Sequence, residues 1–174
     1  VLNLTPNSFS DGGKYLKKNL GILHAKKLIK DGSGILDIGG EATNPGSKDI
    51  SPEEEWRRIS PILLKIKRLK TFISLDTRKS LIMKKGIKSK INLINDVSGL
   101  NFDPDTIKVL TNNAIPFVIH HMQGSPKTMQ KNPKYRNVVL DIYDFFEKKI
   151  DYIRSKGIKH INIILDPGIG FGKN

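Results

Sequence analysis

The sequence predicts an α/β fold of the (β/α)8 TIM-barrel type, truncated to about six strands and five helices. Short apolar runs alternate with segments of helical periodicity along the whole chain, a pattern typical of parallel sheets. Each run ends on a polar residue that could take part in chemistry, and a long polar loop follows. Because barrel active sites form at the carboxyl ends of the strands, these facts favour a barrel over a doubly wound sheet.

The length of the chain sets the extent of the expected barrel. With 174 residues the chain can form one domain with a substantial core, whereas a whole barrel usually needs about 250 residues. We therefore expect a single domain, residues 1–174, that begins inside its first strand and lacks strands seven and eight. We also expect this span alone to be inactive and poorly soluble.

The expected strands end on residues that could bind a polar ligand: Asn3, Asp37, Asp76, Asn95 with Asp96, His120 with His121, and Asp166. Any one Asp or Asn could equally be a helix cap or a turn residue. Four strand ends, each directly after an apolar run, carry such a residue at Asp37, Asp76, Asn95 and Asp166, which weakens that interpretation. Together they could recognise a nitrogen heterocycle, because carboxylates accept hydrogen bonds and Asn both donates and accepts. Buried together, the carboxylates would raise one another's pKa values.

Helix signals separate the strands in the first half of the chain. A helix is expected over 18–30, with Gly32 at its C-cap. Ser51, Pro52 and Glu54 form a strong helix start with a capping box. The inner side of this second helix is expected to carry Ile59, Ile62, Leu63, Ile66 and Leu69.

Three further helices are expected in the second half. A short one follows Lys79, and another is capped by Asp103 and Pro104, with Ile107, Val109 and Leu110 facing inward. A long one spans about 136–155 and ends at Gly157. Its buried stripe is expected to contain Val138, Val139, Ile142, Phe145, Phe146, Ile150 and Ile153.

Composition and charge exclude several classes of function. The chain has no cysteine, and its first residues show neither a basic leader nor a long apolar stretch, so we expect a cytoplasmic protein without a membrane span. The net charge of +13 could indicate nucleic-acid or membrane-surface binding. The lysines are scattered over helix faces, and no basic run is interleaved with aromatic residues. We attribute the charge to A+T-rich codon usage and expect no nucleic acid or membrane as partner.

Two motifs suggest cofactors that the spacing rules out. His120 and His121 are neighbours on a strand and must face opposite sides, so they cannot bind one metal ion together. We expect one to face the barrel mouth and the other to pack under a helix. Three residues separate Gly168 from Gly172, and Asn174 follows Lys173, which does not fit a phosphate-binding P-loop. The glycine-rich segment is better interpreted as a substrate loop.

The loops together resemble dihydropteroate synthase, a pterin-binding enzyme of folate biosynthesis. The similar segments are NLTPNSFSDGG at 3–13, DIGGEAT at 37–43, DT at 76–77, IND at 94–96, HMQGSPKTMQ at 121–130 and LDPGIGFGKN at 165–174. Each segment alone is weakly specific, but six in order with similar spacing are strongly specific. The resemblance covers the whole chain.

The resemblance implies a reaction and a set of roles. p-Aminobenzoate would displace diphosphate from 6-hydroxymethyl-7,8-dihydropterin diphosphate, with Mg²⁺ as cofactor, to give 7,8-dihydropteroate. Asn3 would meet Mg²⁺ and the diphosphate, and Asp37 would steady the pterin end of the pocket. Further substrate-binding positions are expected at Asp76, Asn95, His120 and Asp166 for the pterin and at Thr43, Pro45 and Phe171 for p-aminobenzoate. Of these, Asp76, Asn95 and Asp166 are the expected catalytic residues. The resemblance also implies competition by sulfonamides and a homodimer at full length.

Some positions depart from the family pattern. Asn44 stands where the family usually has Arg, His120 where it often has an apolar residue, and Asn7 where Asp is common. The family's Ser-Arg-Lys segment after strand seven and its Arg-x-His after strand eight have no counterpart in the chain. Two other interpretations stay open: a methyltetrahydrofolate methyl-transfer barrel, and a non-catalytic pterin-binding partner, which Asn44 alone supports.

Overall fold

The computed structural model describes residues 1–5, 18–42, 48–124, 128–130 and 132–173. Within these ranges six strands form one sheet: β1 (Leu2–Asn3), β2 (Ile35–Gly39), β3 (Phe72–Asp76), β4 (Leu93–Asp96), β5 (Phe117–His120) and β6 (Ile163–Asp166). The strands lie in sequence order, and every neighbouring pair is parallel. A doubly wound sheet would reverse its order at a switch point, so the predicted barrel-type arrangement is confirmed.

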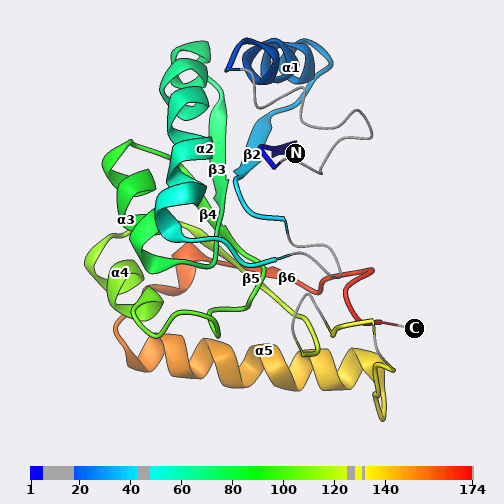
Figure 1. The fold of residues 1–174 in the computed structure, drawn as a ribbon. Helices are drawn as coiled ribbons and strands as arrows, with labels where there is room; N and C mark the ends of the chain where they lie inside the picture. Colours follow the sequence, from blue (N-terminus) through cyan, green and yellow to red (C-terminus); the bar gives the residue numbers. More distant parts are fainter. Residues whose placement is uncertain (6–17, 43–47, 125–127, 131, 174) are drawn as a thin grey trace.

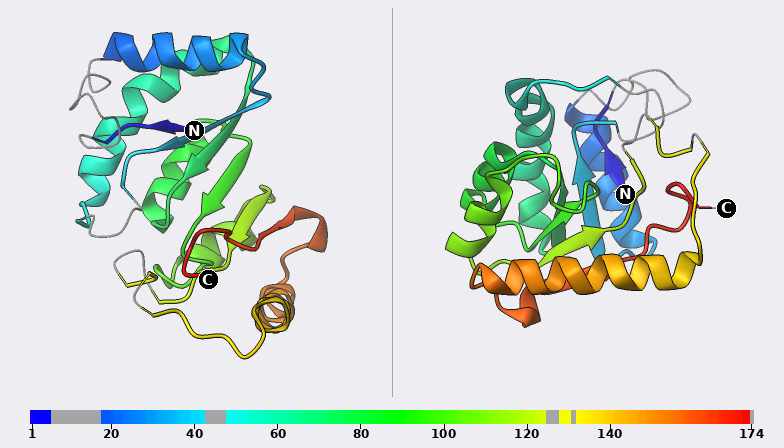
Figure 2. Two further views of the ribbon diagram at one scale, coloured as in Figure 1. Left: turned by 90° about the vertical axis from the view of Figure 1, so that its right-hand side faces the viewer. Right: turned by 90° about the horizontal axis from the view of Figure 1, so that it is seen from below.

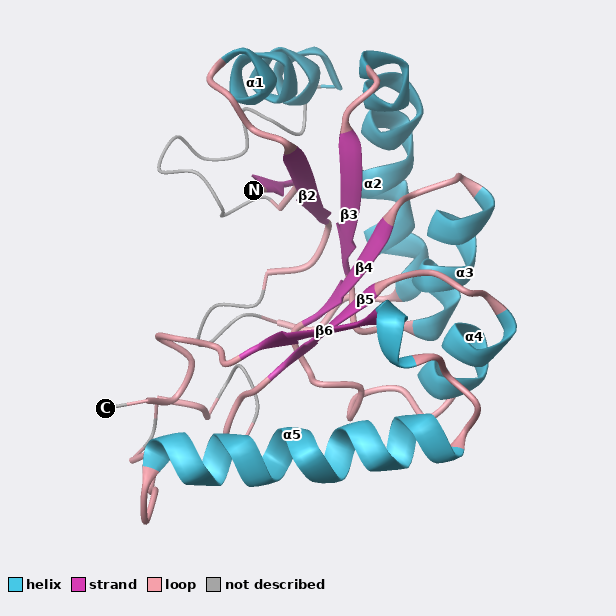
Figure 3. Ribbon diagram, turned by 180° about the vertical axis from the view of Figure 1, so that it is seen from behind, coloured by secondary structure: helices cyan, strands magenta, loops and turns pink. Residues whose placement is uncertain are grey.

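In the described ranges, five α-helices connect these strands and lie along the outer side of the curved sheet (Figures 1 and 3). They are α1 (Lys18–Lys30), α2 (Pro52–Ile66), α3 (Ser80–Lys88), α4 (Thr106–Asn112) and α5 (Val138–Ser155), with short 3₁₀ turns at Lys67–Leu69 and His160–Asn162. The predicted start of α2 is confirmed, because the Ser51 side chain accepts a hydrogen bond from the Glu54 amide at 3.2 Å. None of the helices in these ranges is both long and apolar enough to cross a bilayer.

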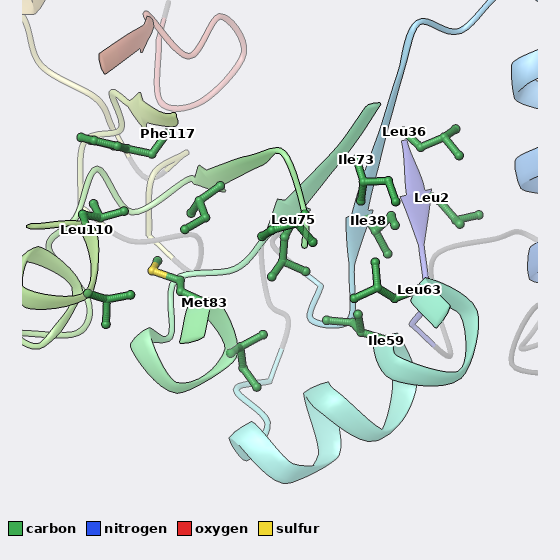
Figure 4. Packing of buried hydrophobic residues seen from close by; sticks show 14 of the residues in the cluster. Leu2, Leu36, Ile38, Ile59, Leu63, Ile73, Leu75, Met83, Leu110 and Phe117 are labelled. Atoms are coloured by element: carbon green, nitrogen blue, oxygen red, sulfur yellow. The ribbon is translucent and has the colours of Figure 1, made fainter. Parts of the chain in front are cut away.

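The hydrophobic core lies between the sheet and the helices. Leu36 and Ile38 of β2 are fully buried there together with Ile59 and Leu63 of α2 (Figure 4). Asp37 stands between Leu36 and Ile38, so its side chain projects from the opposite, inner face of the sheet. The alternation therefore directs apolar side chains toward the helices and leaves the inner face for polar ones.

The strand register brings the predicted strand-end residues together on this inner face. Asn3 pairs with Gly39, Gly39 with Asp76, and Asp76 with Asn95. Toward the opposite edge of the sheet, His120 of β5 pairs with Asp166 of β6. Paired residues of neighbouring parallel strands project from the same face, so one edge of the sheet collects polar groups from all six strands.

The predicted cap at Asp103 is confirmed, because its Oδ1 accepts from the Asp105 amide at 3.0 Å, just before α4 begins at Thr106. The other carboxylate oxygen of Asp103 accepts from the Ser80 amide at 2.8 Å, at the start of the neighbouring α3. Two other predicted details are wrong. Val139 is 70% exposed, although helical periodicity placed it in the buried stripe of α5. The apolar run Ile161 to Leu165 is expected to form the sixth strand, but β6 begins at Ile163, because Ile161 lies in a 3₁₀ turn and is exposed.

Candidate active site

The centre of the inner face is a cluster of two carboxylates and one amide. The Asn95 side-chain amide donates a hydrogen bond to Asp37 Oδ2 at 3.3 Å, across the intervening strand β3. Asp76 lies at the end of that strand, beside Gly39. A Cβ atom on Gly39 would lie 3.1 Å from Asp76 Oδ2, so the glycine makes room for the Asp76 side chain. The expected group of Asp37, Asp76 and Asn95 is thus brought together.

This cluster combines acidic side chains with few hydrogen-bond donors. Burial, followed by the charges of Asp37 and Asp96, raises the pKa of the Asp76 carboxyl well above its usual range. The Asp37 Oδ1 atom is buried and makes no hydrogen bond. Buried acceptors without donors cost free energy, so the arrangement favours a ligand that supplies N–H donors.

Asp96 lies next to this cluster in sequence but faces the helices. Its side chain is fully buried. Oδ1 accepts from the Ser98 amide at 2.8 Å and from the Ser98 hydroxyl at 2.6 Å, whereas Oδ2 makes no hydrogen bond. Burial raises the pKa of Asp96 to about 6. Strand alternation thus directs the adjacent Asn95 and Asp96 into different environments.

The two histidines face opposite sides of the sheet, as predicted. His120 is on the inner face, 3% exposed, with Nδ1 3.1 Å from the Val97 carbonyl oxygen. His121 packs under α5, with its ring 4.8 Å from that of Phe145. Burial lowers both pKa values, that of His121 to about 4, so both rings are neutral near pH 7.

The segment after β6 forms a fixed turn at the edge of the site. Asp166 Oδ1 accepts from the Gly168 amide at 2.8 Å, and the Phe171 amide donates to the Gly168 carbonyl at 2.9 Å. Gly168 has a φ of +67°, and a Cβ atom there would collide with the His121 carbonyl. The turn brings Phe171 edge-on to the His120 ring, with centroids 4.5 Å apart.

A buried ion network that was not predicted from the sequence lies beside the cluster. Lys79 Nζ donates to Glu41 Oε1 at 2.8 Å and to Glu55 Oε2 at 2.7 Å. Arg78 donates to Glu41 Oε2 at 2.9 Å and to Asp49 Oδ1 at 2.8 Å. Burial would raise the pKa of Glu41, but the bonds from Arg78 and Lys79 hold it below its usual value.

The network also ties together both ends of the loop after β2. Glu41 Oε1 accepts from the Ile50 amide at 3.1 Å, so one carboxylate contacts residues on either side of the loop. Thr43 and Pro45, the positions expected to border p-aminobenzoate, lie in this loop but outside the described residues. The structure therefore does not place them.

A metal site made of protein groups alone is absent from the described ranges, which hold no suitable group of three His, Asp or Glu side chains. Asn3 ends β1 at the polar edge of the inner face. Its amide oxygen is a hard ligand of the kind that Mg²⁺ accepts. Mg²⁺ usually keeps several waters and binds through one or two protein groups together with substrate phosphates. One amide oxygen fits that pattern.

Comparison with known proteins agrees with this geometry. The family model described as "Pterin binding enzyme" matches residues 1–174. The dihydropteroate synthase of Neisseria meningitidis serogroup B is 45% identical over 175 residues, which cover 99% of this chain and 61% of the relative. That of Escherichia coli K12 is 39% identical, over 100% of this chain and 62% of the relative.

Solved structures give the same result. The Yersinia pestis dihydropteroate synthase with a sulfonamide drug complex superposes with a TM-score of 0.93 at 37% identity, covering 99% of this chain and 63% of that one. The Xanthomonas albilineans enzyme with 4-aminobenzoic acid gives 0.88 at 33%, covering 99% and 61%. This chain spans about three fifths of the length of these relatives, and the predicted resemblance is confirmed. The chain belongs to the family of pterin-binding enzymes.

Proposed function

We propose that the protein containing this chain is a dihydropteroate synthase. It would join p-aminobenzoate to 6-hydroxymethyl-7,8-dihydropterin diphosphate, giving 7,8-dihydropteroate and diphosphate. The observation that carries the proposal is the inner-face cluster of Asp37, Asp76 and Asn95, with its unpartnered carboxylate oxygen. A pterin ring presents N–H and amino donors to such acceptors.

The same residues suit the chemical step. The bond between the pterin methylene carbon and the diphosphate oxygen breaks, and its electron pair leaves with the diphosphate. Positive charge then develops on the pterin-methyl group, next to the carboxylates of Asp76 and Asp166, which stabilise it electrostatically. The amine of p-aminobenzoate attacks the methylene carbon and loses a proton. Asn95 would orient the ring through its amide.

The remaining roles concern the two ends of the substrate pair. Asn3 would hold Mg²⁺ together with the diphosphate, and the ion would supply charge neutralisation of the leaving group. Thr43, Pro45 and Phe171 would border p-aminobenzoate, and His120 would lie near the pterin face. The Yersinia pestis relative was solved with a sulfonamide drug complex. We propose that sulfonamides compete with p-aminobenzoate here too.

We also propose a cytoplasmic homodimer that uses small-molecule substrates. A diphosphate ester does not diffuse across membranes, so the enzyme must share a compartment with its supply. Residues 1–174 expressed alone should be poorly soluble, because apolar side chains such as Ile35, Phe72 and Ile164 on the inner face are exposed in this span. They should also be inactive, because the family's late Lys, Arg and His segments have no counterpart in this span. Turnover by the isolated span would contradict this part of the proposal.

A direct assay tests the function. The protein is incubated with the pterin diphosphate and p-aminobenzoate, with and without Mg²⁺, and the products are separated by chromatography. We expect Mg²⁺-dependent 7,8-dihydropteroate, with rates that fall as a sulfonamide is added at low p-aminobenzoate. Methyl transfer from methyltetrahydrofolate to a corrinoid would support the methyl-transfer barrel instead. Pterin binding without turnover would support a non-catalytic partner.

A further inference from the structure

The loop after β6 is held in place by the loop after β5. The two segments lie side by side near the C terminus in both views of Figure 2. Gln130 Nε2 donates to the Gly170 carbonyl at 2.7 Å, and the Tyr135 hydroxyl donates to the Gly172 carbonyl at 2.7 Å. Each carbonyl belongs to an immediate neighbour of Phe171. The side chains of one loop thus fix the backbone on both sides of this ring.

Packing at the same place leaves little freedom for the ring. A Cβ atom on Gly172 would lie 2.7 Å from the Met129 carbonyl oxygen, so the two backbones touch. Lys173 Nζ donates to the carbonyls of His121 at 3.1 Å and Phe171 at 3.0 Å. The His120 ring closes the contact from the sheet side. The loop after β5 thus meets the glycine-rich turn along its length.

The glycines explain why outside anchors are needed. Gly170 and Gly172 have φ values of +88° and +63°, a region that glycine enters readily and from which it also leaves readily. The turn has one internal backbone bond across it, from Phe171 to Gly168. The hydroxyl of Tyr135 is protonated near pH 7, since the ordinary pKa of tyrosine is about 10 and burial raises it further.

We infer that Tyr135 and Gln130 are positioning residues that set the place of the Phe171 ring and thereby the affinity for p-aminobenzoate. The inference rests on the proposed function, in which Phe171 borders that substrate. Neither residue needs to touch a substrate. Pterin recognition should be affected much less, because the expected pterin-binding positions, including His120 and Asp166, are held by the strands of the sheet. Tyr135 and Gln130 bond only the loop that follows β6.

Tyr135→Phe is the sharpest test, because it removes one hydroxyl and keeps the ring. In the full-length protein we expect the KM for p-aminobenzoate to rise about three- to tenfold, the effect of losing one hydrogen bond, and to rise further in Tyr135→Phe/Gln130→Ala. The KM for the pterin diphosphate should stay within about twofold. Tyr143→Phe is the matched control, because that tyrosine is exposed on α5.

A second readout does not depend on turnover. Protein labelled with fluorophenylalanine gives a fluorine resonance for Phe171, assigned by its loss in Phe171→Leu. Tyr135→Phe should shift or broaden this resonance, and Tyr143→Phe should not. An unchanged resonance would overturn the positioning role even if the parent proved to have no synthase activity. A shifted resonance with both KM values unchanged, or with both raised equally, would overturn the link to p-aminobenzoate.

Discussion

Two acidic clusters lie side by side where β2 and β3 end, and they are built in opposite ways. Glu41 and Glu55 share the Lys79 ammonium at 2.8 and 2.7 Å, and Arg78 adds a further bond to Glu41. Asp37 and Asp76 have no lysine or arginine bonded to them among the described residues. The first cluster is neutralised from within the protein, whereas the second has no such cation among the described residues. Each keeps one buried oxygen without a hydrogen bond, Glu55 Oε1 and Asp37 Oδ1.

The difference separates a structural role from a binding role. Neutralising cations make the burial of Glu41 and Glu55 tolerable, and the network then holds the ends of the loop after β2. The cluster of Asp37 and Asp76 has a strongly raised pKa at Asp76 and does nothing comparable for the fold. Perturbed carboxyls of this kind gather at functional sites. Substitutions in the two clusters should therefore have opposite effects on stability and on binding.

The largest effect is expected for Lys79→Met. The substitution leaves Glu41 and Glu55 buried without their shared cation, and breaking a buried pair in this way costs about 3–5 kcal/mol. The free energy of unfolding, measured in urea, should fall by that amount. Lys84→Met, on the exposed side of α3, the helix that Lys79 precedes, is the control and should have little effect. Equal stability of Lys79→Met and the parent would show that the network is not structural.

The second largest effect is expected from Asp96, whose carboxyl should make the free energy of unfolding depend on pH. Its folded pKa of about 6 lies above the ordinary value near 4, so the folded state binds the proton more tightly. The corresponding stability is present below about pH 4 and is lost as the pH rises through 6, by roughly 3 kcal/mol. Urea unfolding of the parent and of Asp96→Asn at several pH values isolates this contribution. Parallel curves for the two proteins between pH 4 and 6 would contradict it.

A smaller effect in energy, but the most direct for function, is expected for Asp76→Asn. The neutral side chain removes repulsion from Asp37 and Asp96, so stability should be unchanged or higher. Affinity for the pterin diphosphate should fall at least tenfold, about 1.4 kcal/mol, because an acceptor for ring N–H groups is lost. Isothermal titration and thermal unfolding of the same samples measure both. Undiminished affinity would remove Asp76 from the pterin site.

The contrast also shows what could be read from the sequence. Alternation within strands and the parallel register together determine that Asp37, Asp76, Asn95 and Asp166 share one face. Both the alternation and the register can be inferred from the sequence, because they depend only on where each strand ends. The position of Asn3 at this edge follows in the same way, whereas its role toward Mg²⁺ stays a prediction.

The ion network could not be predicted in this way. Glu55 stands in a first helical turn with Glu53 and Glu54, where acids ordinarily face solvent and favour the helix dipole. Its burial depends on Lys79, 24 residues away, and so on how α2 packs against the end of β3. The predicted burial of Val139 was wrong for a related reason. Periodicity gives the direction of a side chain, but not how far the neighbouring surface extends.

The smallest effect is expected at the exposed end of the same acidic turn. Glu54 bonds Arg57 at 2.7 Å and Arg58 at 2.8 Å, and these bonds lower its pKa to about 2. The pairs nevertheless lie at the surface, where water and salt screen the charges. Glu54→Gln should therefore leave the urea midpoint close to that of the parent, even though Glu54 and Glu55 are neighbours in sequence. Glu55→Gln should lower the urea midpoint clearly, because the buried ammonium of Lys79 would lose one of its carboxylate partners. If both substitutions had the same effect, burial would not be what separates the two kinds of acidic residue.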